Sequence, residues 1–286
     1  MKLLSLSTGT PQAVFGDRDA LRLLSESGFD GADFLLNRHP MLSVSEEETV
    51  RYFSELKAYA DSLGLKIVQT HGLLAGYGPD EEQNILTLEN ARRQLKASAL
   101  LGAEHCVLHS ARAYQWGYDA DIEKVRDANF RLYTALIPTA EEAGVSLCLE
   151  SLGRTKVNDV LGPEFHADPA LLIADHDILP TERKGICLDT DHCYCVMGYG
   201  YPDSAETARL FGKRLKTLHL GDTDGITGSH MIPGKGNVNW AELFRALDEI
   251  SYEGAYNFEL TLPKDGSLES TVRELGTYLR EFVSRY

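Results

Sequence analysis

Residues 144–151 read GVSLCLES: a glycine that can end a helix, a short apolar strand, and polar residues where that strand stops. The same phrase occurs three times upstream, where Gly28 precedes GADFLL, Gly64 precedes KIVQTHG and Gly102 precedes HCVLHS. Each glycine follows an amphipathic run, at the point where a helix end takes the left-handed conformation that glycine adopts without strain. Successive glycines are 36, 38 and 42 residues apart, which indicates a repeat of helix and strand.

Four further apolar stretches complete a set of eight strands: KLLSLST at 2–8, KGICLDT at 184–190, LKTLHLGD at 215–222 and GAYNFEL at 254–260. Helix starts are indicated by Ser45, Asp203 and Asn239, because each is a capping residue with a glutamate three positions later. Eight alternating units over residues 1–286 predict a single (β/α)8 barrel domain. A doubly wound open sheet is the alternative, since alternation alone does not show that the sheet closes.

Composition narrows the class of protein. The length of 286 residues suits one α/β barrel, and the formal charge of -15 disfavours nucleic acid or anionic membrane as a partner. No apolar run approaches the ~20 residues needed to cross a bilayer, and the apolar stretch at the N-terminus is too short for a secretory signal. Five cysteines, an odd number, argue against a disulfide framework. We therefore expect a cytoplasmic protein, and the sequence leaves a homo-oligomer open.

Six successive strands end on a side chain that can bind a metal ion: His71, His109, Glu150, Asp189, His219 and Glu259. Side chains alternate along a strand, and the face opposite these tips carries large apolar residues such as Leu108, Leu149 and Leu218. The apolar face should pack against the helices, so the tips should face the barrel axis. They would then converge at the C-terminal mouth, where barrel enzymes keep their active sites.

The three acidic strand tips are stronger evidence for a metal site than the histidines are. A lone histidine at a strand end is more often a hydrogen-bonded structural residue than a ligand. A carboxylate facing a barrel interior is costly unless paired, and Glu150, Asp189 and Glu259 together would repel one another without a cation between them. The sequence therefore predicts a metal site at the mouth.

Several motifs resemble the xylose isomerase-like barrel superfamily, which includes sugar epimerases, hydroxypyruvate isomerase, inosose dehydratase and type-IV apurinic endonucleases. The resemblance spans nearly the whole chain, and its motifs are specific for the superfamily but weak for any one substrate. They are THG (70–72), LHS (108–110), LES (149–151), LDTDH (188–192), LHLGD (218–222), PGKGNVNW (233–240) and FEL (258–260).

This resemblance implies a ligand set. In the sugar epimerases of the superfamily, four strand tips hold one divalent ion, usually manganese, and here these are Glu150, Asp189, His219 and Glu259. Magnesium, cobalt or zinc are alternatives. The two glutamates correspond to the family's acid/base pair.

The resemblance also implies substrate-binding residues. His192 keeps the spacing after Asp189 of a substrate-binding histidine. His71 and His109 match metal ligands of the endonucleases that often line the pocket in the isomerases, and His230 matches another such position.

Two positions depart from the family pattern. Ketohexose epimerases carry an arginine six residues after the metal-binding histidine, whereas this chain has Gly225, so Lys235 or Arg154 could supply a cation instead. The endonucleases carry an aspartate two residues before the histidine that matches His230, whereas this chain has Gly228. The missing ligand favours one metal ion over a cluster of three.

The expected function is that of a metal-dependent sugar or polyol isomerase or epimerase. A divalent ion can chelate a carbonyl and the adjacent hydroxyl and stabilise an enediolate while one glutamate removes a proton and the other returns one. Alternatives to a small carbohydrate or polyol isomerase are an inosose-type dehydratase, an endonuclease-type metal phosphodiesterase, and a non-catalytic relative that only binds a ligand. Retention of both glutamates speaks against the last, because binding alone needs no acid/base pair.

Overall fold

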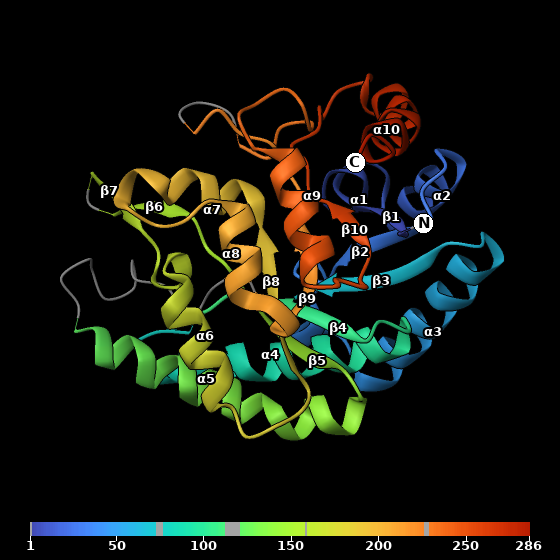
Figure 1. Ribbon diagram of the computed structural model, residues 1–286. Coiled ribbons are helices and arrows are strands. Elements are labelled where there is room, and N and C mark those ends of the chain that lie inside the picture. The colour runs from blue at the N-terminus through green and yellow to red at the C-terminus, as the bar shows by residue number, and fades with distance from the viewer. Residues whose placement is uncertain (1, 73–76, 112–120, 158, 226–228) are drawn as a thin grey trace.

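A computed structural model of the chain describes residues 2–72, 77–111, 121–157, 159–225 and 229–286. Eight parallel strands form one sheet in the order β10-β1-β2-β3-β4-β5-β8-β9, with helices around it (Figure 1). The strands are β1 (Leu4–Ser7), β2 (Gly31–Leu35), β3 (Lys66–His71), β4 (His105–Leu108), β5 (Ser146–Glu150), β8 (Lys184–Asp189), β9 (Leu215–His219) and β10 (Tyr256–Phe258).

The helices follow the strands as the sequence predicts. They are α1 (Gly9–Phe15), α2 (Asp17–Glu26), α3 (Glu46–Ser62), α4 (Glu81–Leu100), α5 (Ile122–Ala143), α6 (Pro169–Ile178), α7 (Thr190–Val196), α8 (Ser204–Phe211), α9 (Trp240–Glu249) and α10 (Leu268–Val283). Short 3-10 turns lie between them, at Met41–Ser43, Phe165–Ala167, Met197–Tyr199 and Gly212–Arg214. Among the described residues, no helix combines the length and the apolar character needed to cross a membrane.

The sheet closes where β9 meets β10. The backbone N–H of Leu220 donates to the carbonyl of Asn257 at 2.8 Å, and the N–H of Glu259 donates to the carbonyl of Leu220 at 3.1 Å. Leu220 and Phe258 form a parallel bridge at the same place. The structure is therefore a (β/α)8 barrel and not a doubly wound open sheet.

Local signals at the helix ends have the predicted geometry. The four glycines of the repeat all have positive φ, between 68° and 83°. Ser45 forms a capping box with Glu48, each side chain accepting from the other residue's backbone N–H. The side chains of Asp203 and Asn239 accept from the N–H three residues later, which satisfies one of the unpaired donors at each helix start.

Side-chain alternation sorts the strands into an outer and an inner set. Outward residues such as Leu108 and Leu218 are completely buried in the layer between sheet and helices. One layer below the strand tips, Val107, Cys148 and Cys187 form a small separate cluster inside the barrel. All five cysteines are free.

An antiparallel hairpin at the C-terminal mouth was not predicted. Strands β6 (Arg154–Val157) and β7 (Val160–Pro163) pair after β5. Their four-residue segments RTKV and VLGP show no alternation of apolar and polar residues, and Val160 and Leu161 are exposed. Without a buried face, a strand this short leaves no periodic pattern in the sequence.

The close packing of α10 on the end of α2 makes Gly276 sensitive to substitution. A Cβ atom at Gly276 would lie 1.7 Å from the backbone carbonyl oxygen of Ser27, which cannot move aside as a flexible side chain would. Gly276→Ala should therefore destabilise the fold by about 1–3 kcal/mol through overpacking, outweighing the gain of about 1 kcal/mol in helix propensity. Gly266→Ala is the matched control, because nothing lies within 4 Å of a Cβ there. Urea unfolding measures both; equal midpoints would show that α10 shifts at no cost.

Candidate active site

The six strand tips meet at the C-terminal mouth of the barrel. One potential ligand atom from each of Glu150, Asp189, His219 and Glu259 lies within 4.8 Å of the other three. These residues come from β5, β8, the end of β9 and the residue after β10, so four separate strands supply them. The structure thus brings together the four residues that the family resemblance implies as metal ligands.

His219 stands at the centre of this group. Its Nδ1 atom lies 2.9 Å from Glu150 Oε1, 3.1 Å from Glu259 Oε2 and 4.0 Å from Asp189 Oδ2. The side chains of Glu150, Asp189 and His219 are at most 1% exposed, whereas that of Glu259 is 24% exposed. Glu259 is therefore the member of the group that opens toward the mouth.

Two further histidines lie on the other side of Glu150. Its Oε2 atom is 2.8 Å from His109 Nε2 and 3.4 Å from His71 Nε2. The ring of His71 also stacks on that of His219, with centroids 5.1 Å apart. The Nδ1 atom of His192 is 3.6 Å from Glu150 Oε1. Both His71 and His109, predicted from the sequence, therefore belong to the same cluster, and four imidazoles surround the Glu150 carboxylate.

The electrostatics of the cluster favour ionised carboxylates beside positive charge. Burial by itself raises the pKa of Glu150, but His109 and His219 outweigh it and hold the pKa well below its ordinary value. At Glu259 burial acts in the same direction, and His219 with its neighbouring imidazoles lowers the pKa to about 2. The pKa of His219 lies well above its ordinary value despite burial, because Cys187, Glu259 and Glu150 surround it. Positive charge beside these carboxylates therefore stabilises the cluster.

The chemistry of the donors fits a divalent cation. Asp189 Oδ2 is buried, and none of the described residues donates a hydrogen bond to it, which is costly for a carboxylate oxygen. Burial raises the pKa of Asp189, and the facing His192 and His230 offset this only in part. Carboxylate oxygens with an imidazole nitrogen are the donor set that hard or borderline divalent ions such as Mn²⁺ prefer.

His192 and His230 complete the mouth on the Asp189 side. The Nδ1 of His192 lies 2.9 Å from the carbonyl oxygen of Ser151, and the Nδ1 of His230 lies 3.2 Å from that of Glu259. A carbonyl can only accept, so Nδ1 carries the proton in each ring and Nε2 is left for another partner. The Nε2 of His230 lies 3.8 Å from Asp191 Oδ2, which is beyond hydrogen-bond distance. Both rings also lie within 4 Å of Asp189 Oδ2.

The two predicted cationic residues do not join this cluster. The guanidinium of Arg154, on β6, donates to the carbonyl of Gly225 at 2.6 Å. The side chain of Lys235 is exposed, and within the described ranges no hydrogen bond or ion pair links it to the strand tips. Gly228, the position that departs from the endonuclease pattern, lies outside the described residues.

Sequence reasoning missed Asp33. This residue lies on β2 one layer below the tips, is fully buried, and has its Oδ2 atom 3.2 Å from Nε2 of His219. A signal was present, because Asp33 is the single charged residue in GADFLL and alternates with the outward Ala32 and Phe34. The argument that an inward carboxylate needs a partner applies to it as well as to the strand tips.

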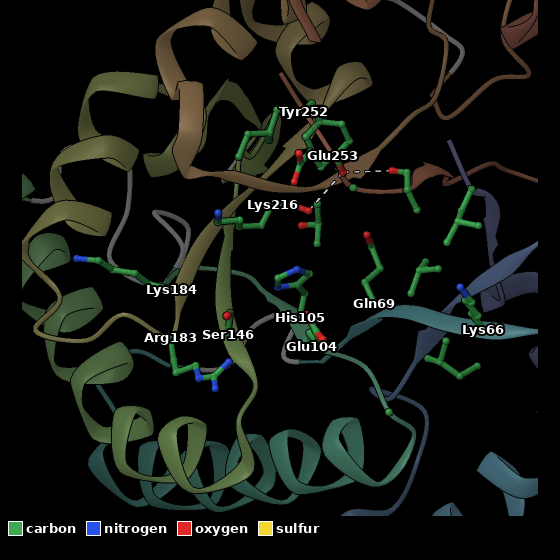
Figure 2. A pocket seen from close by; sticks show the side chains of 18 of the residues that line it. Lys66, Gln69, Glu104, His105, Ser146, Arg183, Lys184, Lys216, Tyr252 and Glu253 are labelled. Atoms are coloured by element: carbon green, nitrogen blue, oxygen red, sulfur yellow. Dashed lines mark hydrogen bonds between the residues drawn. The ribbon is translucent and has the colours of Figure 1, made fainter. Parts of the chain in front are cut away.

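A cavity of about 1000 Å³ lies at the opposite, N-terminal mouth. Figure 2 shows Gln69, His105 and Lys216 around it, beside residues from the starts of other strands. None of the six strand tips lines this cavity. The convergent acids and histidines therefore identify the C-terminal mouth as the candidate active site.

Several known proteins whose sequences are similar to this chain are sugar epimerases. A D-psicose 3-epimerase from Enterocloster bolteae is 30% identical over 233 residues, which cover 77% of this chain and 69% of that protein. A fructoselysine 3-epimerase from Escherichia coli O157:H7 is 24% identical, with 84% of each chain covered. In fold, the chain resembles the crystal structure of a D-tagatose 3-epimerase-like protein, with a TM-score of 0.77 at 20% identity, covering 100% of this chain and 99% of that one.

The fold also resembles that of a 3-keto-D-glucoside 4-epimerase from E. coli, with a TM-score of 0.75 at 19% identity, covering 98% of this chain and all of the other. At such identities the structural likenesses show the fold alone. The sequence profile of one family, described as xylose isomerase-like TIM barrel, matches residues 21–282. Because that match covers most of the sequence, and the barrel has the corresponding architecture, the chain belongs to the xylose isomerase-like TIM barrel family.

Proposed function

We propose that this protein is a sugar epimerase or isomerase that depends on one divalent metal ion. The observation that carries the proposal is the convergence of Glu150, Asp189, His219 and Glu259 on one point in the barrel mouth. The similarity to D-psicose and fructoselysine 3-epimerases supports a small carbohydrate, and a ketose in particular, as the substrate. Manganese is the ion we expect, with magnesium, cobalt or zinc as alternatives.

The four convergent residues would hold the ion. A bound divalent cation would polarise the sugar carbonyl and stabilise the negative charge that develops when the neighbouring carbon loses a proton. His219 would contribute Nδ1, the atom that faces the three carboxylates. The depressed pKa of Glu150 and of Glu259 keeps both carboxylates in the ionised form that binding requires.

We assign proton transfer to Glu150 and Glu259. Strands β8 and β9 lie between their strands, and the Nδ1 of His219 lies between their carboxylates, so the two acids approach one point from different directions. A sugar carbon held there would give its proton to one ionised carboxylate. The other carboxylate would first take up a proton from a substrate hydroxyl or from water, and would then deliver that proton to the carbon. Return to the opposite face of the same carbon gives an epimer, return to the neighbouring carbon gives an isomer, and loss of a hydroxyl gives the dehydratase reaction.

The histidines around the mouth would orient the substrate. His192 and His230 each use Nδ1 on a backbone carbonyl, which leaves Nε2 to meet a sugar oxygen. His71 and His109 would play the same part from the Glu150 side. Rings held in this way fix the reacting carbon relative to the carboxylates.

The substrate contact that ketohexose epimerases make through arginine would differ here. Gly225 has a φ of 72°, and a Cβ atom there would lie 2.8 Å from the ring of Tyr194, so an arginine side chain does not fit without movement. Arg154 already reaches the carbonyl of Gly225 and is the cation we assign to this side of the mouth. Lys235 is exposed in the loop between β9 and α9 and is the second candidate for a cationic contact with the substrate.

A metal phosphodiesterase is the second candidate function. The observation that favours it is the presence of further ligand groups, His71–His109–Glu150 and Asp189–His192–His230, which overlap the central four residues. A cluster of several ions would use such groups. The formal charge of -15 and the epimerase relatives favour the sugar reaction, and the number of bound ions separates the two functions.

The first prediction concerns metal content. After loading with Mn²⁺ and dialysis, elemental analysis should find one ion per chain, because one set of four donors converges. His219→Ala should remove that ion, since it deletes the central nitrogen. His105→Ala is the control: His105 lines the cavity at the N-terminal mouth, and its loss should leave the metal content unchanged. Three tightly bound ions per chain, whether manganese or zinc retained from expression, would contradict the epimerase proposal and favour phosphoester hydrolysis.

The second prediction concerns the glutamates. Glu150→Gln and Glu259→Gln should each lower kcat on the best substrate of a ketose panel by about 100-fold or more, because an amide cannot accept the proton. Glu269→Gln, on the exposed face of α10, should keep wild-type activity. Circular dichroism checks that the barrel remains folded. A near-native kcat in either variant would rule out the two-glutamate mechanism.

The third prediction concerns His192. His192→Ala should lower kcat/KM by about 10-fold or more, as expected for losing a hydrogen bond to substrate at a partly buried polar site, while metal content falls little. The physical reason is that Nδ1 is bound to the carbonyl of Ser151 and the ring lies beside the central group without being part of it. Steady-state kinetics and metal analysis on the same sample test this. Complete loss of metal would instead make His192 a ligand.

A further inference from the structure

A chain of polar side chains runs beneath the candidate active site. The hydroxyl of Ser5 donates to Asn257 Oδ1, and Asn257 Nδ2 donates to Asp33 Oδ2 at 3.2 Å. The same Asp33 oxygen lies 3.2 Å from Nε2 of His219. All four residues are 0% exposed, and they come from β1, β10, β2 and β9, so the chain crosses the interior of the barrel.

Asp33 has one ion-pair partner among the described residues. No lysine or arginine of the described chain forms an ion pair with it, and the imidazole of His219 is the only charged or chargeable group at ion-pair distance. Asp33 Oδ1 and His219 Nε2 both lack an aligned hydrogen bond, although the two side chains are in contact. A carboxylate oxygen without a donor and a ring nitrogen beside it are complementary, and a small rotation of the ring would satisfy both.

The surroundings of the other ring nitrogen of His219, Nδ1, explain the role of the contact between Nε2 and Asp33. Nδ1 faces Glu150, Asp189 and Glu259, which are acceptors. If Nδ1 binds a cation among these acids, the proton of the neutral ring must sit on Nε2, directly beside Asp33. Metal-binding histidines usually donate their second N–H to a carboxylate or carbonyl, which fixes the ring and raises its basicity.

We propose that Asp33 is a positioning residue, which accepts the Nε2–H of His219 and thereby turns Nδ1 toward the bound metal. This inference rests on the proposed metal site. It adds a buried carboxylate beneath that site, which contacts neither metal nor substrate but acts through His219. The hydrogen bonds from Ser5 through Asn257 hold the Asp33 carboxylate in place, which links three strands of the barrel to the orientation of one ligand.

Metal affinity tests the proposal. The dissociation constant for Mn²⁺ is measured by competition with a chelator in the wild type, Asp33→Asn and Ser5→Ala. Asp33→Asn keeps the shape but removes the charge, and should weaken binding by about 10- to 100-fold. Ser5→Ala removes the hydrogen bond at the far end of the chain, and should weaken binding by less than Asp33→Asn does. The same measurement on Ser98→Ala is the matched control, because this variant removes a buried hydroxyl that contacts Thr70 and lies outside the chain, and it should leave the constant unchanged. A folded Asp33→Asn protein that binds Mn²⁺ as tightly as the wild type would overturn the proposal.

A measurement on the wild-type chain covers the case in which Asp33→Asn fails to fold. In the ¹⁵N-labelled, zinc-loaded protein, NMR should show a proton on Nε2 of His219, with the signal assigned by its absence in His219→Gln. Metal bound at Nε2, or an Nε2 without a proton, would refute the role of Asp33 while leaving the metal site intact. If the wild type binds no divalent ion at all, the proposed function fails, and this inference fails with it.

Discussion

The central constraint in this protein is the mutual repulsion of three carboxylates that point into one barrel mouth. Glu150 and Asp189 are buried and Glu259 is partly exposed, and ionised acids this close together need positive charge between them. The surrounding imidazoles supply part of that charge, and a divalent ion would supply the rest. The polar lining of the mouth follows from this constraint, since a purely apolar wall could not stabilise the three acids.

Barrel closure and the candidate site depend on the same residues. The backbone hydrogen bonds that join β9 to β10 involve Leu220 and Glu259. Leu220 directly follows His219, and Glu259 is itself one of the four convergent residues. Closure therefore sets the distance between His219 on one strand and Glu259 on the next. Beneath them, Asp33 and Asn257 tie β2 and β10 to the same histidine, so the site is supported from the interior as well as from the mouth.

Much of this arrangement could be predicted from particular residues. Alternation along the strands placed Glu150, Asp189 and His219 on the inner face, because large apolar residues occupy the other face. The glycines of the repeat predicted the helix ends, since positive φ is costly for other residues. The β6–β7 hairpin was not predictable, because it buries no periodic face, and the significance of Asp33 was overlooked because its partner lies 186 residues away in the sequence.

By itself, the sequence determined which residues face inward, where the helices begin and end, and that several potential ligands stand at equivalent strand positions. These are local properties, set by backbone conformation and by the two-residue period of a strand. Closure of the sheet, the meeting of four ligand atoms within 4.8 Å, the turning of Arg154 to Gly225 and the contact of Asp33 with His219 were decided only by the tertiary structure. Each depends on distances between segments far apart in the chain, which a pattern of neighbouring residues does not encode.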